Sequence, residues 1–412
     1  MSYLFLRNFC MLKSLNPERR TQAILLVLML VMFTSIADFM ILMPLAPDLM
    51  HEMHIDTARF GLLVSAYSLA AGVASLLAAS LADRFDRRQA LLFCYAGLVL
   101  ATLACSLATG FYSLLLARCL AGVFGGVIGS IILAIVGDLI PPERRGWAMS
   151  WVMLGFSLSA VAGVPLGLFI AAHSNWRMPF VALSVMCSVI WIGVFYLLPA
   201  VKGHLSKGMP AQGLLAGYKE LFADRNHWWA CGVTALLTLS GFCVIPYIAS
   251  TMVSNSGLST HDLVYMYLLG GVATLFSRPV IGGLIDRHSP RRILAYLVLA
   301  SFIPLILVTQ TFSLSVAWHL LFSTLFFVFV SGRFIPATAM VTGATAPQMR
   351  GRLMAFNSAT QNFASGFAAL LAGLIMTQTA EGRILNFDWV GYLSCVFGLA
   401  AIWMARRVKA VS

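Results

Sequence analysis

The sequence predicts an all-α membrane protein of twelve transmembrane helices, arranged as two related six-helix halves. Of its 412 residues, 60% are hydrophobic and only 10% are charged, and the mean hydropathy is +0.89. A soluble globular domain is roughly 45–50% apolar and about 25% charged, so it could not cover this much apolar surface. Lipid must therefore solvate most of the chain. Two further observations, a set of long apolar runs and a repeated series of landmarks, give the number of helices and their division.

Twelve segments of the chain reach the length of roughly 20 mainly apolar residues that a helix needs to cross a bilayer. We expect them at about residues 22–45, 57–82, 89–108, 112–136, 146–172, 177–200, 227–252, 261–284, 290–310, 314–337, 352–376 and 387–405. The stretch 201–226 is the one long polar connection and contains proline and several glycines, as linkers do. The expected organisation is a terminal segment at 1–21, a first half at 22–200, a linker at 201–226, a second half at 227–405 and a tail at 406–412.

The distribution of Lys and Arg predicts the orientation of the spans. If both termini lie in the cytoplasm, the inner segments hold 21 of the 27 basic residues and the outer loops hold only three. The positive-inside rule therefore predicts cytoplasmic termini and a cytoplasmic linker, and we expect a bacterial inner (plasma) membrane. The last three basic residues, Arg118, Arg278 and Arg333, lie inside expected spans. Because the basic residues are dispersed between apolar runs, the net charge of +12 does not point to nucleic acid.

The two halves carry the same landmarks in the same order. The paired residues lie at nearly one spacing: Asp83 and Asp286 are 203 residues apart, Pro142 and Pro347 are 205 apart, and Pro44 and Pro246 are 202 apart. Such a repeat indicates a duplicated unit of six spans.

The loop Asp83-Arg84-Phe-Asp86-Arg-Arg88 resembles the signature between spans two and three of the major facilitator superfamily. The family usually has Gly where Asp86 stands, but a second copy of the loop lies in register at 284–292. The resemblance covers essentially the whole chain. It implies the major facilitator fold, a central cavity between the halves, and alternating access rather than enzymatic catalysis.

Two further motifs resemble those of a subgroup, the twelve-span drug and metabolite proton antiporters. Arg118-Cys-Leu-Ala-Gly122 is similar to the span-four pattern of proton-coupled members. The stretch that contains Gly155, Gly163, Pro165 and Gly167 is similar to the span-five antiporter motif. The resemblance implies proton-coupled export of a small organic molecule, with the proton as coupling ion and no cofactor. Two other functions stay open: a proton-coupled uptake symporter for a sugar, nucleoside or organic acid, and a membrane sensor or assembly partner that does not transport.

One acidic residue, Asp38, lies in the middle of an apolar run, whereas the other fourteen acids fall in loops or at span ends. A carboxylate inside a bilayer is costly unless it is paired, hydrated or protonated, so Asp38 is the candidate proton-binding residue. Arg118 lies at a matching depth from the outer face, at about six residues into span four, and is the expected partner. The alternative for both residues is a permanent polar contact or ion pair that only fixes helix packing.

Several other residues are candidates for binding or for conformational change. Pro165 and its neighbouring glycines suggest a bend and a close helix approach in span five, either for alternating access or for packing alone. Arg278 and Arg333 could hold an anionic substrate, although we expect a snorkelling or gate-locking role. The loop residues expected to form a cytoplasmic gate, or to act only as topogenic charges, are Asp83, Arg84, Arg88, Asp286, Arg287 and Arg292. The residues expected to line the cavity, or to pack between helices, are Tyr67, Ser157, Tyr247, Asn357, Gln361 and Asn362.

The sequence predicts neither a metal site nor a transporter driven by nucleotide hydrolysis. Its eight cysteines form no CxxC pair and fall mostly inside apolar runs. There is no GxxxxGK[ST] motif, which leaves an ion gradient as the energy source. The expected partners are a small-molecule substrate and the lipid bilayer, without nucleic acid, and we expect a monomer.

Overall fold

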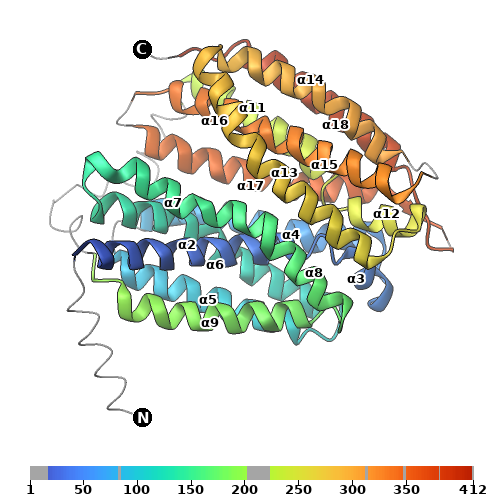
Figure 1. Cartoon of the computed structure of the whole chain (residues 1–412), viewed down its shortest axis with the longest axis horizontal. Coiled ribbons are helices and arrows are strands. Elements are labelled where there is room, and N and C mark those ends of the chain that lie inside the picture. Colours follow the sequence, from blue (N-terminus) through green and yellow to red (C-terminus); the bar gives the residue numbers. More distant parts are fainter. Residues whose placement is uncertain are drawn as a thin grey trace.

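The computed structural model describes residues 17–81, 85–201, 223–310, 314–346, 349–379 and 381–410. Its helices form two bundles, one from the blue and green part of the chain and one from the yellow to red part (Figure 1). Helices suit these apolar runs because a helix satisfies its own backbone hydrogen bonds where lipid offers no partner. Most of the expected linker, residues 202–222, lies outside the described residues, so the division into halves at 201–226 stays a prediction.

The first bundle contains α2 (Pro17–Ile41), α3 (Ala46–Glu52), α4 (Thr57–Leu81), α5 (Arg87–Ser106), α6 (Phe111–Leu139), η2 (Pro142–Arg144), α7 (Arg145–Leu158), η3 (Ser159–Gly163), α8 (Val164–Ala172) and α9 (Met178–Leu197). The second bundle contains α11 (Arg225–Phe242), α12 (Ile248–Ser256), α13 (Thr260–Arg287), α14 (Pro290–Thr309), α15 (Val316–Gly332), α16 (Phe334–Gly343), α17 (Arg350–Ile375) and α18 (Phe387–Ala405). We call them the first and the second half.

Ten of the expected spans are confirmed as helical segments that are long and apolar enough to cross a membrane, counted among the described residues. The seventh expected span corresponds to α11 and α12, and the eleventh corresponds to α17, whose first turn carries Arg350 and Arg352. The all-α architecture is therefore confirmed, whereas the count of twelve spans stays a prediction.

Four expected spans are interrupted rather than continuous. Spans one and seven each break into turns just before or around a proline, at residues 42–45 with Pro44 and at 243–247 with Pro246. Proline disfavours helical backbone in the residue before it and lacks a donor, which explains both breaks. Span five contains the π-helix η3 immediately before Pro165, and span ten changes from α15 to α16 at Arg333. One short hairpin, β1 (Thr377–Gln378) with β2 (Ile384–Leu385), follows α17 and was not predicted.

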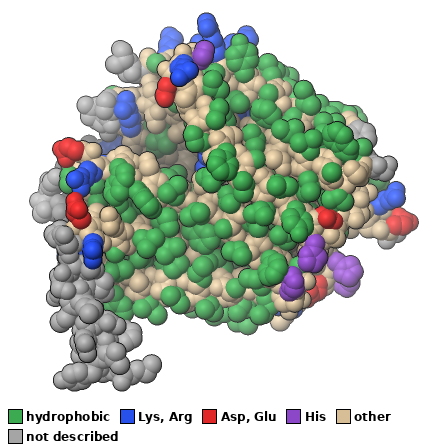
Figure 2. Space-filling view, viewed as in Figure 1, with side chains coloured by type: hydrophobic (Ala, Val, Ile, Leu, Met, Phe, Trp, Pro, Cys, Tyr) green, Lys and Arg blue, Asp and Glu red, His purple; other side chains and the backbone are tan. Residues whose placement is uncertain are grey.

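The described chain begins and ends at the same end of the molecule, which we call the linker end; the opposite end, which carries α3 and α12, is the far end (Figure 1). Figure 2 shows hydrophobic side chains over the middle of the molecule and charged side chains gathered toward the two ends. This distribution is that of a protein with a lipid-facing belt. In the predicted orientation the linker end is cytoplasmic.

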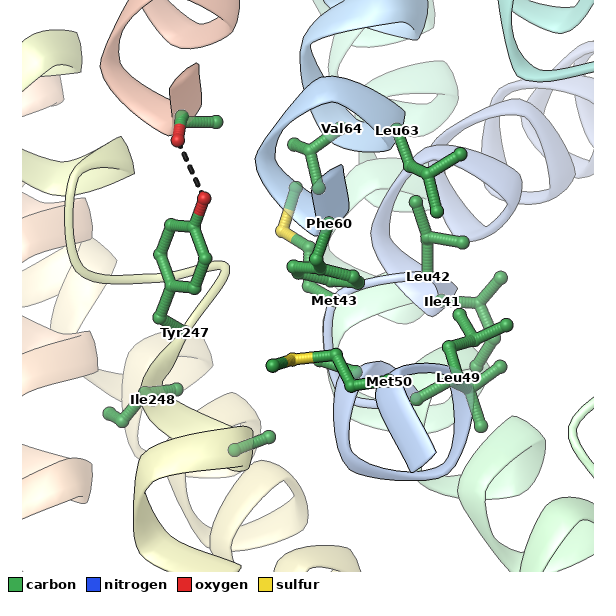
Figure 3. Close-up of a cluster of buried hydrophobic side chains, with 14 of the residues drawn as sticks. Ile41, Leu42, Met43, Leu49, Met50, Phe60, Leu63, Val64, Tyr247 and Ile248 are labelled. Carbon is green, nitrogen blue, oxygen red and sulfur yellow. Dashed lines mark hydrogen bonds between the residues drawn. The ribbon is translucent and has the colours of Figure 1, made fainter. Parts of the chain in front are cut away.

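The buried hydrophobic residues show which end is closed. One cluster contains residues of both halves, among them Leu42 and Phe60 of the first and Val244 and Tyr247 of the second, all toward the far end (Figure 3). The two other clusters each belong to one half and lie toward the linker end. Figure 2 shows a hollow between the halves at the linker end. The structure is therefore closed at the far end and open at the linker end, which is inward-facing in the predicted orientation.

Candidate functional site

Asp38 and Arg118 form a buried ion pair inside the first half. Asp38 lies one turn before the end of α2, and Arg118 lies two turns into α6, so the antiparallel helices bring them to one level. Nη1 of Arg118 lies 3.2 Å from Oδ2 of Asp38, and the two side chains are 1% and 0% exposed. The same nitrogen donates to the main-chain oxygen of Asp38 at 3.0 Å. The structure thus brings together the two residues that the sequence placed at equal depth.

Three neighbours complete the surroundings of the pair. Thr102 of α5 donates to Oδ1 of Asp38 at 2.8 Å. The guanidinium of Arg118 lies over the ring of Tyr67, 4.5 Å from its centroid, and Phe39 packs on the same ring at 5.1 Å. A buried carboxylate with these donors can exist charged, and it can take up a proton only if water or a substrate reaches it. Tyr67, expected to line the cavity, instead packs beneath Arg118.

The sequence did not single out Thr102, although a signal was present. Thr102 is a polar residue four positions from the far end of α5, a depth close to that of Asp38 in α2. Phe39 provides a second unexpected contact, because its ring stacks on Phe242 of α11 at 5.9 Å between centroids. The residue after Asp38 therefore touches the other half.

The antiporter-like motif of span five packs against α2, the helix that carries Asp38. A Cβ on Gly155 would lie 2.5 Å from the main-chain oxygen of Met29, so only glycine permits this approach. Gly163 and Gly167 face Ala37 and Ile41 in the same way. In η3 the amide of Val164 donates to the main-chain oxygen of Ser159, five residues back, beside Pro165. The expected close approach is present and a π-helix precedes Pro165, while a bend and its change during transport stay predictions.

Arg278 connects the two halves from the part of α13 (Thr260–Arg287) that lies toward the linker end. From α13 its Nη1 donates to Oγ of Ser157 in α7 at 2.9 Å, and its guanidinium lies 5.3 Å from the centroid of Phe156. Two of the sequence candidates, Arg278 and Ser157, are thus partners. Phe156 was not expected, because sequence alone does not give the rotation of span five about its axis.

Arg333 does not snorkel, contrary to one expected role. Its side chain is 0% exposed, between α15 and α16 in the interior of the second half. Nη2 donates to the main-chain oxygen of Leu237 at 3.1 Å and Nη1 to Oγ of Ser301 at 3.4 Å, while Nε has no partner. The error has a simple cause: distance along a helix gives depth in the membrane, but not the face of the helix on which a side chain lies.

The remaining cavity candidates lie in different surroundings. Tyr247 is buried at the far end, where its hydroxyl donates to the main-chain oxygen of Ala369 in α17 at 2.6 Å (Figure 3). Asn357 of α17 accepts a hydrogen bond from Thr234 of α11 within the second half. Gln361 and Asn362 are half-buried, and their side chains make no hydrogen bond with another described residue. They lie just on the linker-end side of Phe363, whose ring packs against Gly72 of α4.

Of the expected gate residues, Asp83 and Arg84 lie outside the described residues. Arg88 packs within the first half, with Nη2 donating to the main-chain oxygen of Phe195 at 2.5 Å. Asp286, Arg287 and Arg292 are exposed at the linker end. The ion pairs found between described residues each join partners of the same half. Because two of its residues lie outside the described residues, a latch between these loops stays a prediction. Within the described ranges no group of three His, Cys, Asp or Glu could hold a metal ion.

Comparison with known proteins agrees with this architecture. The sequence model of the Major Facilitator Superfamily matches residues 28–332 and 230–411. A protein of Bacillus subtilis (strain 168) named "Uncharacterized MFS-type transporter YceJ" is 24% identical over 367 residues, which cover 88% of this chain and 92% of that protein. A protein of Helicobacter pylori (strain P12) named "Probable sugar efflux transporter" is 23% identical over 365 residues, which cover 88% of this chain and 89% of the other.

Solved structures show the same fold. A bacterial homolog of the human lysosomal transporter Spinster, in an inward-facing and occupied conformation, superposes with a TM-score of 0.76 at 15% identity, covering 97% of this chain and 100% of the other. A D-xylose-proton symporter superposes with a TM-score of 0.76 at 16% identity, covering 94% of this chain and 99% of that one. The chain therefore belongs to the major facilitator superfamily, and it is a multi-pass membrane transporter rather than an enzyme.

Proposed function

We propose that this transporter exports a small organic molecule in exchange for protons, and that Asp38 carries the proton. The observation that carries the proposal is the buried pair of Asp38 and Arg118, in which a carboxylate away from the ends of its membrane-spanning helix is fully removed from solvent. Arg118 keeps its charge under all physiological conditions. Any proton that the pair exchanges must therefore be carried by Asp38.

The position of Asp38 links proton exchange to the movement of the halves. Its helix α2 packs against the glycines of span five, and Phe39 touches Phe242 of the second half. In the present conformation the far-end cluster covers this region. When the far end opens, contacts around Phe39 must separate, and water can then reach Asp38 from the outer side. Such a change in access is what coupling by alternating access needs.

Export is supported by the span-five motif and by the names of relatives. The relatives from Helicobacter pylori are named as sugar efflux transporters, which favours a polar, sugar-sized substrate moved outward. Uptake symport would use the same carboxylate with the opposite coupling. The likeness to a D-xylose-proton symporter concerns the fold alone and does not favour that alternative.

The test is proton movement in proteoliposomes that contain a trapped pH-sensitive dye. Monosaccharides and sugar acids are added one at a time to vesicles with an acidic interior, and the same series is repeated with the gradient reversed. An exporter of this kind should alkalinise the acidic interior when its substrate is added. A symporter should move protons in the same direction as the added substrate, and so acidify the interior. A sensor should give no change in pH in either series. The last two results would each overturn the proposal.

A further inference from the structure

The charges inside the membrane-spanning helices do not balance. Three guanidinium groups lie there, those of Arg118, Arg278 and Arg333, but the described part of these helices contains one interior carboxylate, that of Asp38. Asp38 is already bound by Arg118. Arg278 and Arg333 therefore have no carboxylate partner among the described residues. Charges inside a membrane protein are expensive and usually have a counter-charge or face water.

The two unbalanced arginines differ in what can reach them. Arg333 is completely buried among the helices of the second half and is held by Leu237 and Ser301. Arg278 is only partly buried, and it lies seven residues beyond Gly271 toward the linker end. At Gly271, α13 crosses span five so closely that a Cβ would lie 2.8 Å from the main-chain oxygen of Ala160. The Cα of Arg278 thus lies about 10 Å along α13 from this crossing, and its guanidinium contacts Ser157, three residues before Ala160, on the side of the crossing toward the open linker end.

The contacts of Arg278 leave most of its donors available. A guanidinium has five N–H donors, and here one hydrogen bond is formed, to Oγ of Ser157. The ring of Phe156 lies beneath the group and leaves its edge free. The planar fork of arginine matches the two oxygens of a carboxylate, which it binds with two parallel, charge-assisted hydrogen bonds. Half-buried Gln361 and Asn362 of α17, whose side chains make no hydrogen bond with another described residue, could bind hydroxyl groups.

We propose that the substrate is a sugar-sized organic monoanion and that Arg278 binds its carboxylate. This inference rests on the proposed function, of which it names the substrate class. A ligand with one negative charge is favoured over a phosphate dianion because only one of the two unbalanced guanidinium groups, that of Arg278, is accessible. The guanidinium of Arg333 is enclosed. The bound carboxylate replaces or shares the contact with Ser157, so a substrate held by Arg278 of the second half also touches the first half. Binding by both halves is what allows a substrate to favour their closure around it.

The test is binding in detergent solution, measured by the thermal unfolding of the purified full-length chain. The probes are pairs of an acid and its neutral parent: glucuronate with glucose, galacturonate with galactose, and gluconate with glucitol. At least one acid should raise the unfolding temperature while its neutral parent does not, since ligand binding to the folded state stabilises it. Arg278→Gln should abolish this shift. Arg278→Lys keeps the charge but not the fork, and it should weaken binding by roughly ten-fold.

The matched control is Arg350→Gln, which removes the same charge at an exposed position at the start of α17 and should leave the shift unchanged. The proposal is overturned if a neutral parent stabilises the protein as well as its acid, if no acid of the panel stabilises it, or if the shift persists in folded Arg278→Gln. Stabilisation by a hexose phosphate and by no carboxylate would overturn the assignment of a monoanion. Should Arg278→Gln fail to fold, Arg278→Lys and the paired probes still decide. Since equilibrium binding needs no proton gradient, a failure of proton coupling would leave this result intact, and the reverse also holds.

Discussion

The guanidinium of Arg118 binds Asp38 twice, at 3.2 Å to the side-chain oxygen Oδ2 and at 3.0 Å to the main-chain oxygen. It also reaches the main-chain oxygen of Phe39 at 3.5 Å. Removing the carboxylate charge therefore does not leave Arg118 without acceptors, and the pair can be altered chemically without loss of its position. This arrangement makes the pair suitable for a direct test of proton coupling.

We predict that Asp38→Asn inserts and folds but loses accumulation of substrate driven by a pH gradient. Asparagine keeps the shape of the side chain: its amide oxygen can accept from Arg118 and its NH2 group can donate to the hydroxyl of Thr102, yet it cannot release a proton at physiological pH. The corresponding position of span seven is Ser240, so the second half offers no acid that could replace it. Gradient-driven transport by vesicles should fall at least ten-fold, the effect expected when a required charge-assisted interaction is lost.

The control for this variant is Asp388→Asn, which changes an acid in the first turn of α18, away from the pair. It should transport as the wild type does. Retained gradient-driven transport in folded Asp38→Asn would falsify the assignment of the proton to this residue. The proton would then be sought on the substrate or on a histidine such as His319, which lies in α15.

The hydrogen bond from Ser65 of α4 to the main-chain oxygen of Gly366 in α17, at 2.7 Å, joins the two halves at the far end. We predict that Ser65→Ala shifts the equilibrium toward the conformation that is open at the far end. The loss of one such bond changes the free-energy difference by about 1 kcal/mol, or roughly five-fold in population. Labelling of a single cysteine introduced at the far end measures the shift.

Ser75→Ala is the matched control, because it is the same substitution in the same helix. Ser75 donates only to Ala71 and Gly72 of its own helix, so its loss affects both conformations alike. Equal labelling of the two variants would show that the bond from Ser65 does not bias the equilibrium.

The crossing of α13 and span five leads to a second packing prediction. Gly271→Ala places a methyl group 2.8 Å from the main-chain oxygen of Ala160, which the helices can accommodate only by moving apart. Overpacking of this kind costs about 1–3 kcal/mol, and the thermal unfolding temperature should fall. Gly283→Ala in the same helix has no atom within 4 Å of its new methyl group and should be neutral. A loss of stability of the same size in both variants would contradict the crossing as its cause, since Gly→Ala by itself favours a helix.

Asp286 is expected to influence the conformational equilibrium and not substrate binding. It is exposed at the end of α13 in this structure, which is open at the linker end, and no ion pair between described residues holds it. We predict that Asp286→Asn increases labelling of a cysteine at the linker end and leaves ligand affinity within a few-fold of the wild type, apart from the change in population. Loss of binding with unchanged labelling would contradict this role.

A pH-dependent contribution to stability is expected from Asp48 in α3, beyond the end of the first span. Partial burial, and next the carboxylate of Glu52, raise the pKa of Asp48 above its ordinary value of 3.8, while His51 opposes the shift. A raised pKa means that ionisation costs more in the folded than in the unfolded protein, so stability falls as pH rises through the folded pKa. Asp48→Asn should therefore raise the unfolding temperature at neutral pH. This gain should shrink toward zero as pH approaches 3.8, and an equal gain at both pH values would exclude the titration as its cause.

The features predicted correctly from the sequence depend only on position along the chain. Apolar runs gave the helices, and equal depth from one face gave the contact between Asp38 and Arg118. The rotation of each helix about its axis could not be predicted in this way, because nearly every face of these helices is apolar. Tyr67 was therefore expected in the cavity but packs under Arg118, and Arg333 was expected near the surface but is enclosed.

Local breaks were also beyond the sequence argument. Pro44, Pro246 and Pro165 were all noted, yet proline inside a membrane helix can produce a turn, a π-helix or a simple kink. Packing against neighbouring helices decides between them. At Ser159–Gly163 the wider turn is the surface on which Gly271 of the other half lies, a partner that no local pattern reveals.

The far-end cluster shared by both halves has a consequence for how the protein melts. In the present conformation, the unfolding of one half would expose side chains of the other, such as Phe60 beside Tyr247, whose rings lie 5.8 Å apart. The halves should therefore unfold in a single cooperative calorimetric transition here, although each has its own core toward the linker end. Once the two halves separate at the far end, they no longer share this cluster. Each half can then unfold in its own calorimetric transition. The number of melting transitions thus becomes a reporter of conformation that requires neither a label nor a known substrate.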